Sequence, residues 1–226
     1  MDEMAVLAEM YNLITPNKRI MFDRIAADRT KHLTVVLENV YQDHNASAIL
    51  RSCDCFGIQD LYVIEKNFRY EVKRDIALGA GRWVDLHQYN EGNSPDVECI
   101  KDLKKKGYRI VATSPHSQYR TIHDLELEKP IALIFGTERR GISVELLESA
   151  DEHVKIPMYG FTESLNVSVA AAITLEVIRE RLERTHINWR LSESEQTALK
   201  LKWSRSILRG GEELEEKIRE RIFQKE

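Results

Sequence analysis

Polar side chains gather in four loops of the chain, and their types limit the chemistry that the chain could perform. The loops read YQDHN (41–45), ATSPHSQ (112–118), FGTERRGIS (135–143) and PMYGFTESLN (157–166). Within and just after them, we expect six polar residues to converge: Asn45, Arg51, Thr113, Glu138, Ser164 and Asn166. No nucleophile stands beside an obvious base in this set. The residues therefore predict a site that binds and positions a substrate rather than a nucleophilic one.

Several standard catalytic fingerprints are missing. A dinucleotide site would need G-x-G-x-x-G after its first strand, but the apolar run at 33–40 is followed by a loop without glycine, and no P-loop pattern occurs. Ser164 stands in E-S-L and not in G-x-S-x-G, which argues against a serine hydrolase. Glu138 fits a general acid or base as well as a cap or an ion-pair partner, and its spacing does not decide between them.

Strands that alternate with helices must position these loops. Apolar runs predict strands at 33–40, 60–66, 83–89, 108–114, 130–136 and 152–158. Helical spacing and end residues predict helices from Met4 to Ile14, from about residue 17, at 45–57 with Asn45 as the N-cap, at 94–107 and at 143–150. This alternation favours a parallel α/β sheet with helices on both faces. In such a sheet, ligands bind beyond the carboxyl ends of the strands, where the four loops lie.

The composition of the 226 residues, with 42% hydrophobic and 31% charged, is that of a globular protein. No apolar run approaches the roughly 20 residues of a membrane span, so we expect no membrane partner. The three cysteines are an odd number, which argues against a disulfide framework, and the acidic start lacks signal-peptide features. Both observations predict a cytoplasmic protein. A metal site at His44, Cys53 and Cys55 would lack the second pair of ligands that closed zinc sites use, so we expect no metal.

The net charge of −4 hides three basic runs, at 17–31, 66–82 and 200–209. Such runs usually form solvated helix faces. They are also consistent with local phosphate-binding patches on an otherwise acidic chain. Charge alone leaves both interpretations open.

Three segments taken together are much more specific. NASAILR (45–51), IFGTERRGIS (134–143) and IPMYGFTESLNVSVAAA (156–172) resemble, in order and spacing, the three motifs of the SPOUT superfamily of knotted RNA methyltransferases. The resemblance is to its tRNA guanosine-2′-O-methyltransferase branch and extends over roughly residues 17–190. It implies a SPOUT-type domain at 31–184 with a C-terminal trefoil knot. Helical extensions would lie at 1–30 and 185–226.

The resemblance also implies a cofactor. Family members hold S-adenosylmethionine in the knot, where backbone groups of tight loops bind the adenine and the methionyl tail. The residues of this chain at matching positions are Thr113, Gly136, Thr137, Ile156, Met158 and Leu165. Since this cofactor has no phosphates, the missing glycine-rich phosphate loop is explained.

The reaction that the resemblance implies is methyl transfer to a ribose 2′-hydroxyl. Arg51 matches the family's essential arginine, and it would act as the base or, because a guanidinium stays charged, bind a phosphate or the developing alkoxide. An ion pair with Glu38 or Asp54 is the structural alternative. Asn45 would orient Arg51 or the ribose. Glu138, Ser164 and Asn166 match polar positions of the site whose catalytic and structural roles the sequence does not separate, although we expect Asn166 to be a site residue rather than a cap.

The resemblance further implies a homodimer that modifies a D-loop guanosine at tRNA position 18. The small residues 170–172 fit a close helix contact, within one chain or between two. Basic residues at both ends of the matched region would contact tRNA: Lys18, Arg19, Arg24, Arg29, Arg179 and Arg181. The alternatives are an rRNA 2′-O-methyltransferase, which the lack of a separate RNA-binding domain before residue 17 disfavours, and a catalytically silent RNA-binding module of the same fold.

Overall fold

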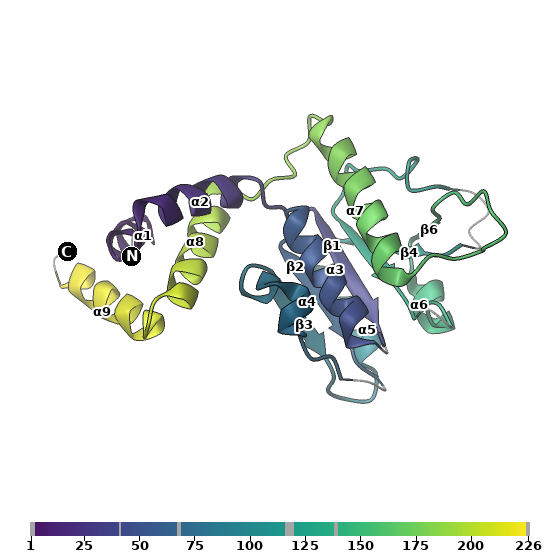
Figure 1. Cartoon of the computed structure of the whole chain (residues 1–226), viewed down its shortest axis with the longest axis horizontal. Coiled ribbons are helices and arrows are strands. Elements are labelled where there is room, and N and C mark those ends of the chain that lie inside the picture. The colour runs from purple at the N-terminus through teal and green to yellow at the C-terminus, as the bar shows by residue number, and fades with distance from the viewer. Residues whose placement is uncertain (1–2, 41, 67–68, 116–119, 138–139, 225–226) are drawn as a thin grey trace. The chain divides into compact units, whose positions relative to one another are not determined.

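The computed structural model of the chain describes residues 3–40, 42–66, 69–115, 120–137 and 140–224. These residues form two compact units (Figure 1). One unit runs from Lys31 to Trp189, and the other combines the two ends of the chain, up to Thr30 and from Arg190 on. The terminal segments, which the sequence suggests as separate extensions, thus pack together.

A six-stranded sheet forms the centre of the larger unit, and every pair of neighbouring strands is parallel. Its strands follow the order β3-β2-β1-β5-β4-β6. All six coincide with predicted strands: β1 (Leu33–Glu38), β2 (Asp60–Ile64), β3 (Asp85–Tyr89), β4 (Arg109–Thr113), β5 (Ile131–Phe135) and β6 (Glu152–Val154). The continuously apolar runs are explained by burial, because every residue of β1, β2 and β5 is buried.

Helices cover both faces of this sheet, as predicted (Figure 1). Alternate residues of β1 point to opposite faces. Leu33, Val35 and Leu37 join the core beneath α3 (Asp43–Cys55) and α7 (Val167–Glu183). Val36 joins the core on the other face, beneath α5 (Pro95–Lys105) and α6 (Val144–Ser149).

The helix ends follow the sequence in part. Pro95 opens α5, and Gly107, at φ +86°, follows its end in the left-handed conformation that glycine favours. The prediction that Asn45 caps α3 is wrong, because the helix begins at Asp43 and Asn45 is buried in its first turn. The carboxylate of Asp43, in the first turn of α3, suits the positive end of the helix dipole. Two short elements, α4 (Arg74–Ala77) and the 3₁₀ helix η1 (Ala80–Arg82), follow β2 and were not predicted.

The smaller unit consists of α1 (Glu3–Asn12), α2 (Pro16–Ala27), α8 (Glu193–Ile207) and α9 (Gly211–Phe223). Its apolar core includes Val6, Leu7, Met10, Leu201 and Ile218. The hydroxyl of Thr15 caps α2, and a reciprocal capping box between Ser192 and Glu195 starts α8. In the part of the chain that the structure describes, no helix is long and apolar enough to cross a membrane.

Candidate functional site

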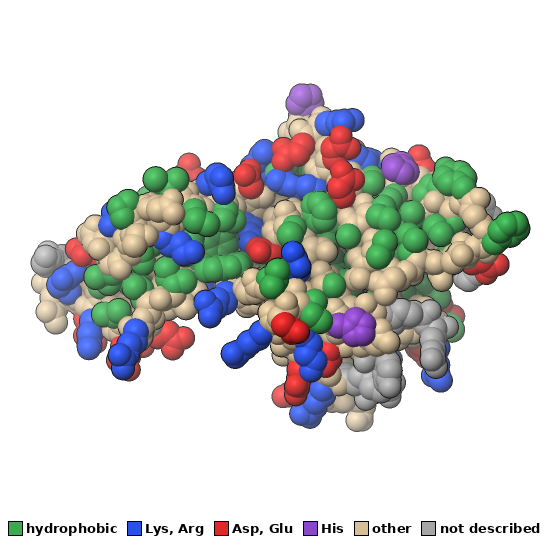
Figure 2. All heavy atoms as spheres, viewed as in Figure 1, with side chains coloured by type: hydrophobic (Ala, Val, Ile, Leu, Met, Phe, Trp, Pro, Cys, Tyr) green, Lys and Arg blue, Asp and Glu red, His purple; other side chains and the backbone are tan. Residues whose placement is uncertain are grey.

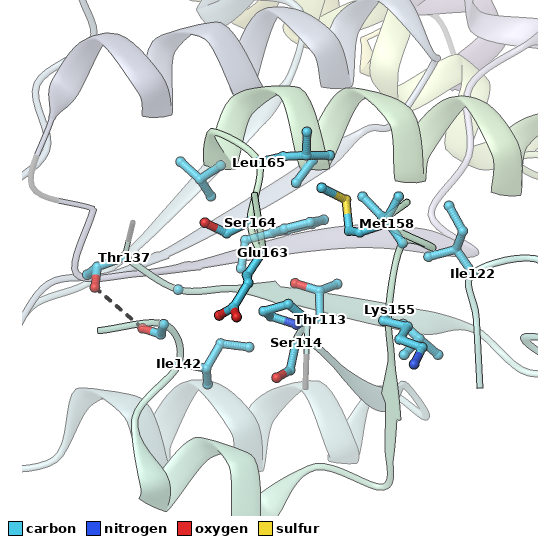
Figure 3. Close-up of a pocket in the computed structure, with 18 of the residues that line it drawn as sticks. Thr113, Ser114, Ile122, Thr137, Ile142, Lys155, Met158, Glu163, Ser164 and Leu165 are labelled. Carbon is cyan, nitrogen blue, oxygen red and sulfur yellow. Dashed lines mark hydrogen bonds between the residues drawn. The ribbon is translucent and has the colours of Figure 1, made fainter. Parts of the chain in front are cut away.

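A pocket of about 370 Å³ lies beyond the carboxyl ends of β4, β5 and β6 (Figure 3). Its walls come from the loops that follow these three strands and from the start of α7. A volume of this size suits a small-molecule ligand. All six residues that match the family's cofactor positions line it: Thr113, Gly136, Thr137, Ile156, Met158 and Leu165.

Apolar side chains form much of the pocket wall. Phe135 ends β5, Ile142 and Ile156 lie in the loops after β5 and β6, and Val167 begins α7; all four face the same space. Among the polar groups, the hydroxyl of Thr113 is already used, because it donates a 2.7 Å hydrogen bond to the carbonyl of Ile134. Such a surface can hold a flat aromatic ring by dispersion and by exclusion of water.

The backbone around Gly136 explains why a glycine stands there. A reciprocal pair of hydrogen bonds, 3.0 and 2.9 Å long, joins the backbones of Thr137 and Gly141 and closes a tight turn. A Cβ atom on Gly136 would lie 2.2 Å from the carbonyl carbon of Gly141 and 2.3 Å from the nitrogen of Ile142. Only glycine allows this approach. Glu138, a predicted site residue, lies outside the described residues.

Two predicted site residues, Asn45 and Asn166, meet although they are far apart in the sequence. The amide nitrogen of Asn166 donates a 3.2 Å hydrogen bond to the amide oxygen of Asn45. The oxygen of Asn166 accepts from the backbone N–H of Ser168 and Val169 and so caps α7. The expectation that Asn166 is not a cap was therefore wrong, and its single side chain both caps α7 and contacts α3.

The neighbouring serines differ in their surroundings. Ser164 lines the pocket. The hydroxyl of Ser168 donates a 2.6 Å hydrogen bond to the capping oxygen of Asn166. Ser168 therefore supports the cap of α7.

Arg51 does not line the pocket of its own chain. It is exposed on α3, in a shallow groove that it shares with Ala48, Phe56 and Ile76. Among the described residues it forms no hydrogen bond or ion pair, so the alternative of a pair with Glu38 or Asp54 is not seen. Instead, Glu38 accepts a hydrogen bond from the backbone N–H of Ser143. The guanidinium is thus available for a ligand outside the pocket.

Three of the six arginines and lysines predicted to bind RNA are engaged inside the protein. Arg29 is only 1% exposed and lies over the ring of Trp203, so the expectation that it contacts phosphate is wrong. Arg179 stacks on Trp189 and forms an ion pair with Glu183. Arg181 donates hydrogen bonds to the carbonyls of Ile122 and Leu125, at 2.9 and 2.5 Å.

The remaining predicted cations lie on α2. Arg24 is exposed, whereas Lys18 and Arg19 are half-buried. Lys18 lies over the ring of Phe22, and Arg19 donates to the carbonyl of Ile14.

Sequence reasoning missed several residues of the pocket. Ile122 comes from a segment with no predicted element, and it was undetectable without the fold. Lys155 and Glu163 also line the pocket, and both lie within or beside segments of the third motif. No three His, Cys, Asp or Glu side chains gather as a metal site would require in the described parts of the chain.

Comparison with known proteins agrees with this architecture. The sequence model of one family, described as the SpoU rRNA Methylase family, matches residues 32–176. A Borreliella burgdorferi protein named tRNA (guanosine(18)-2′-O)-methyltransferase is 36% identical over 217 residues, which cover 96% of this chain and 98% of that protein. The crystal structure of the A. aeolicus TrmH/SpoU tRNA modifying enzyme matches with a TM-score of 0.75 and 31% identity, over 85% of this chain and 98% of that one.

A more distant structure shares the fold. The SpoU methyltransferase AviRb from Streptomyces viridochromogenes, solved in complex with the cofactor AdoMet, has a TM-score of 0.57 at 24% identity, over 68% of this chain and 59% of that chain.

Proposed function

This chain belongs to the SpoU rRNA methylase family, and we propose that it transfers a methyl group from S-adenosylmethionine to the ribose 2′-hydroxyl of a tRNA guanosine, at position 18 of the D-loop. The observation that carries the proposal is the pocket beyond β4, β5 and β6, which gathers all six residues at the family's cofactor positions. The tRNA substrate is supported by the relative from Borreliella burgdorferi, which aligns over nearly the whole of both chains.

The pocket fits the proposed cofactor in size and in chemistry. Its apolar walls suit the adenine, and its volume is about 370 Å³. The backbone of Gly141 and Ile142 approaches Gly136 so closely that no side chain fits there. When bound, S-adenosylmethionine supplies an electrophilic methyl group on a sulfonium. The proposed trefoil knot would be formed by the C-terminal third of the domain, which also contributes the pocket residues after β5 and β6.

The polar residues around the pocket would position the ribose rather than attack it. Asn45 and Asn166 hold each other at the junction of α3 and α7, beside the pocket residue Leu165. Ser164 lies on the pocket wall, where its hydroxyl can bind the ribose or the methionyl tail. Correct alignment of the acceptor oxygen with the methyl group supplies much of the rate enhancement in such transfers. Glu138 keeps its proposed place in the site on the motif match alone.

The proposed unit is a homodimer, which would also account for the exposed position of Arg51. Hydrophobic side chains gather over α7 and on the loop before it (Figure 2). Val169 and Ile173 of α7 are 45% and 37% exposed, and Tyr159 and Phe161 of the loop are almost fully exposed. Such patches mark interaction sites. A second copy seated there could bring further groups to a bound RNA, and light scattering would measure the mass of the assembly.

In this proposal, Arg51 binds an RNA phosphate or stabilises the alkoxide that forms as the 2′-hydroxyl loses its proton. A guanidinium has five donors and stays charged at neutral pH, which suits anion binding better than proton removal. Lys18, Arg19 and Arg24 remain the proposed cations of the helical unit for RNA contact.

The direct test uses the whole chain with S-adenosylmethionine labelled on its methyl group and unmodified total RNA. Mapping of the labelled nucleotides should place the label on the ribose of guanosine 18 of tRNA. Label on rRNA alone would contradict the tRNA assignment. Binding of the cofactor without transfer would favour a silent RNA-binding module.

Arg51→Ala should abolish measurable transfer. If the arginine stabilises charge in the transition state, the rate should fall by about 10³-fold or more. Its cofactor affinity should stay unchanged, because Arg51 does not line the pocket. Arg184→Ala, at an exposed arginine just after α7 and outside the three basic runs, is the matched control and should retain transfer. Retained turnover in Arg51→Ala would remove this residue from the mechanism.

A further inference from the structure

The pocket contains one acidic side chain among its described lining residues, Glu163. It belongs to the loop before α7, and Figure 3 shows its carboxylate directed into the pocket, toward the wall that carries Thr113, Ser114 and Ile142. Hydrogen bonds and ion pairs of this carboxylate with other described residues are absent. An anion that points into an otherwise mainly apolar pocket, without a partner among the residues that the structure describes, is suited to attract a positive charge on the ligand.

The cations that line the pocket do not neutralise Glu163. Lys155 lies toward Ile122, and Figure 3 shows its ammonium turned away from the carboxylate. Arg140, the other described lining cation, is exposed and forms no ion pair with Glu163. Neither of the two described lining cations therefore pairs with the carboxylate, which faces the space for the ligand.

We propose that Glu163 makes the pocket selective for the charge on sulfur, so that it favours S-adenosylmethionine over the demethylated product. This inference rests on the proposed function. In the transfer, the carbon–sulfur bond breaks, its electron pair stays on sulfur, the methyl group bonds to the ribose oxygen, and the hydroxyl proton leaves to solvent or a base. Sulfur changes from a cationic sulfonium to a neutral thioether. Glu163 attracts the sulfonium but not the thioether. Its contribution to the binding free energy therefore falls when the reaction is complete.

The consequence for turnover is easier exchange of product for fresh cofactor. The two molecules share adenine, ribose, ammonium and carboxylate, so the apolar walls bind both alike. In this proposal, the single carboxylate directed into the pocket separates them by charge. Because Glu163 is exposed, solvent screens the attraction, and we expect a difference of about fivefold to tenfold rather than several hundredfold.

Isothermal titration calorimetry on the full chain tests the proposal with three ligands: S-adenosylmethionine, S-adenosylhomocysteine, and sinefungin, in which a protonated amine replaces the sulfonium. Glu163→Gln keeps the shape of the side chain and removes its charge. We expect it to weaken binding of the two cationic ligands by about fivefold to tenfold and of the neutral product by less than twofold. Glu163→Asp should retain most of the preference.

The matched control is Glu98→Gln, at an exposed glutamate on α5, which lies on the opposite face of the sheet from α7. It should leave all three dissociation constants unchanged. Equal weakening of all three ligands by Glu163→Gln would mean that Glu163 binds a group they share, and this result would overturn the inference, as would no change at all. Failure of the unaltered protein to bind any of the three would instead contradict the proposed cofactor.

Discussion

The amide of Asn166 connects two elements of the proposed site at the scale of one residue. Its oxygen caps α7 through the N–H groups of Ser168 and Val169, and its nitrogen donates to Asn45 on α3. Neither half of the amide is replaceable by the other, because one accepts and the other donates. The residue thus fixes the start of α7 relative to the family's first motif.

Replacement of Asn166 by aspartate separates these two roles. Asn166→Asp keeps the capping oxygen, and its charge suits a helix N-terminus, so the melting temperature should change little. The variant has no N–H for Asn45, so methyl transfer should fall by at least about tenfold, as expected when a positioning hydrogen bond is lost. Asn166→Ala should in addition lose about 1 kcal/mol of stability. Full activity in the aspartate variant would show that the contact with Asn45 is dispensable.

Gly136 allows a second test at this scale. A Cβ there would overlap the backbone of Gly141, so Gly136→Ala must open the turn and should cost about 1–3 kcal/mol of stability together with most cofactor binding. Gly160→Ala, in another loop near the pocket, meets no atom within 4 Å and serves as the control. Calorimetric binding and thermal unfolding measure both effects, and equal behaviour of the two variants would contradict the steric argument.

At the scale of elements, α7 does more than cover the sheet. Val167 and Ala170 near its start line the pocket, while Arg181, near its end, holds the segment around Ile122 by two backbone carbonyls. Burial lowers the pKa of Arg181 below its ordinary value, yet the nearby charges of Asp124 and Glu128 oppose this shift. Because Ile122 is part of the pocket wall, the two hydrogen bonds of Arg181 hold this part of the wall in place.

Arg181→Gln should therefore weaken cofactor binding and destabilise the fold by about 2 kcal/mol, since two hydrogen bonds of a charged donor are lost. Affinity for RNA, and its dependence on salt, should stay the same, because the guanidinium is used internally. Arg184→Gln, at an exposed arginine of the following turn, provides the control. Filter binding and calorimetry distinguish the outcomes. A fall in RNA affinity with unchanged cofactor affinity would restore Arg181 as an RNA contact.

At the scale of the whole molecule, the two ends of the chain build a unit with its own buried charge cluster. Glu215 is 5% exposed, and it accepts from Arg205 at 2.5 Å and from Arg219 at 2.8 Å. Burial raises the pKa of Glu215, but the hydrogen bonds and charges of the two arginines lower it more, so the net pKa lies below its ordinary value. The carboxylate therefore stabilises this unit only while it is ionised.

A lowered folded-state pKa means that this stabilisation is present above the unfolded pKa of about 4.3 and is lost as the pH falls through the folded value. Glu215→Gln should lower stability at pH 7 by about 2 kcal/mol, a discounted value because both arginines are partly exposed. Its unfolding temperature should then depend less on pH between about 5 and 3 than that of the unaltered chain. Circular dichroism melts check this, with the exposed neighbour in Glu216→Gln as control. Identical pH profiles for all three proteins would falsify the assignment.

The sequence by itself determined the parts of this protein that local chemistry controls. Continuous apolar runs predicted all six strands, because a parallel strand that is buried on both faces tolerates little else. The parallel direction of those strands placed the four loops at one edge of the sheet, and the motif match named the six residues that the pocket gathers.

Tertiary structure decided which distant partner each polar group meets. Asn45 and Asn166 lie 121 positions apart, and no periodicity could join them or predict that Asn166 both caps and bridges. The same limit explains Arg29 and Arg181, which the resemblance suggests as RNA contacts. In the structure Arg29 lies over the ring of Trp203, and Arg181 donates to two loop carbonyls. A charged side chain is read from the sequence as exposed because burying it is costly. Only the fold shows where a matching ring or carbonyl offsets that cost.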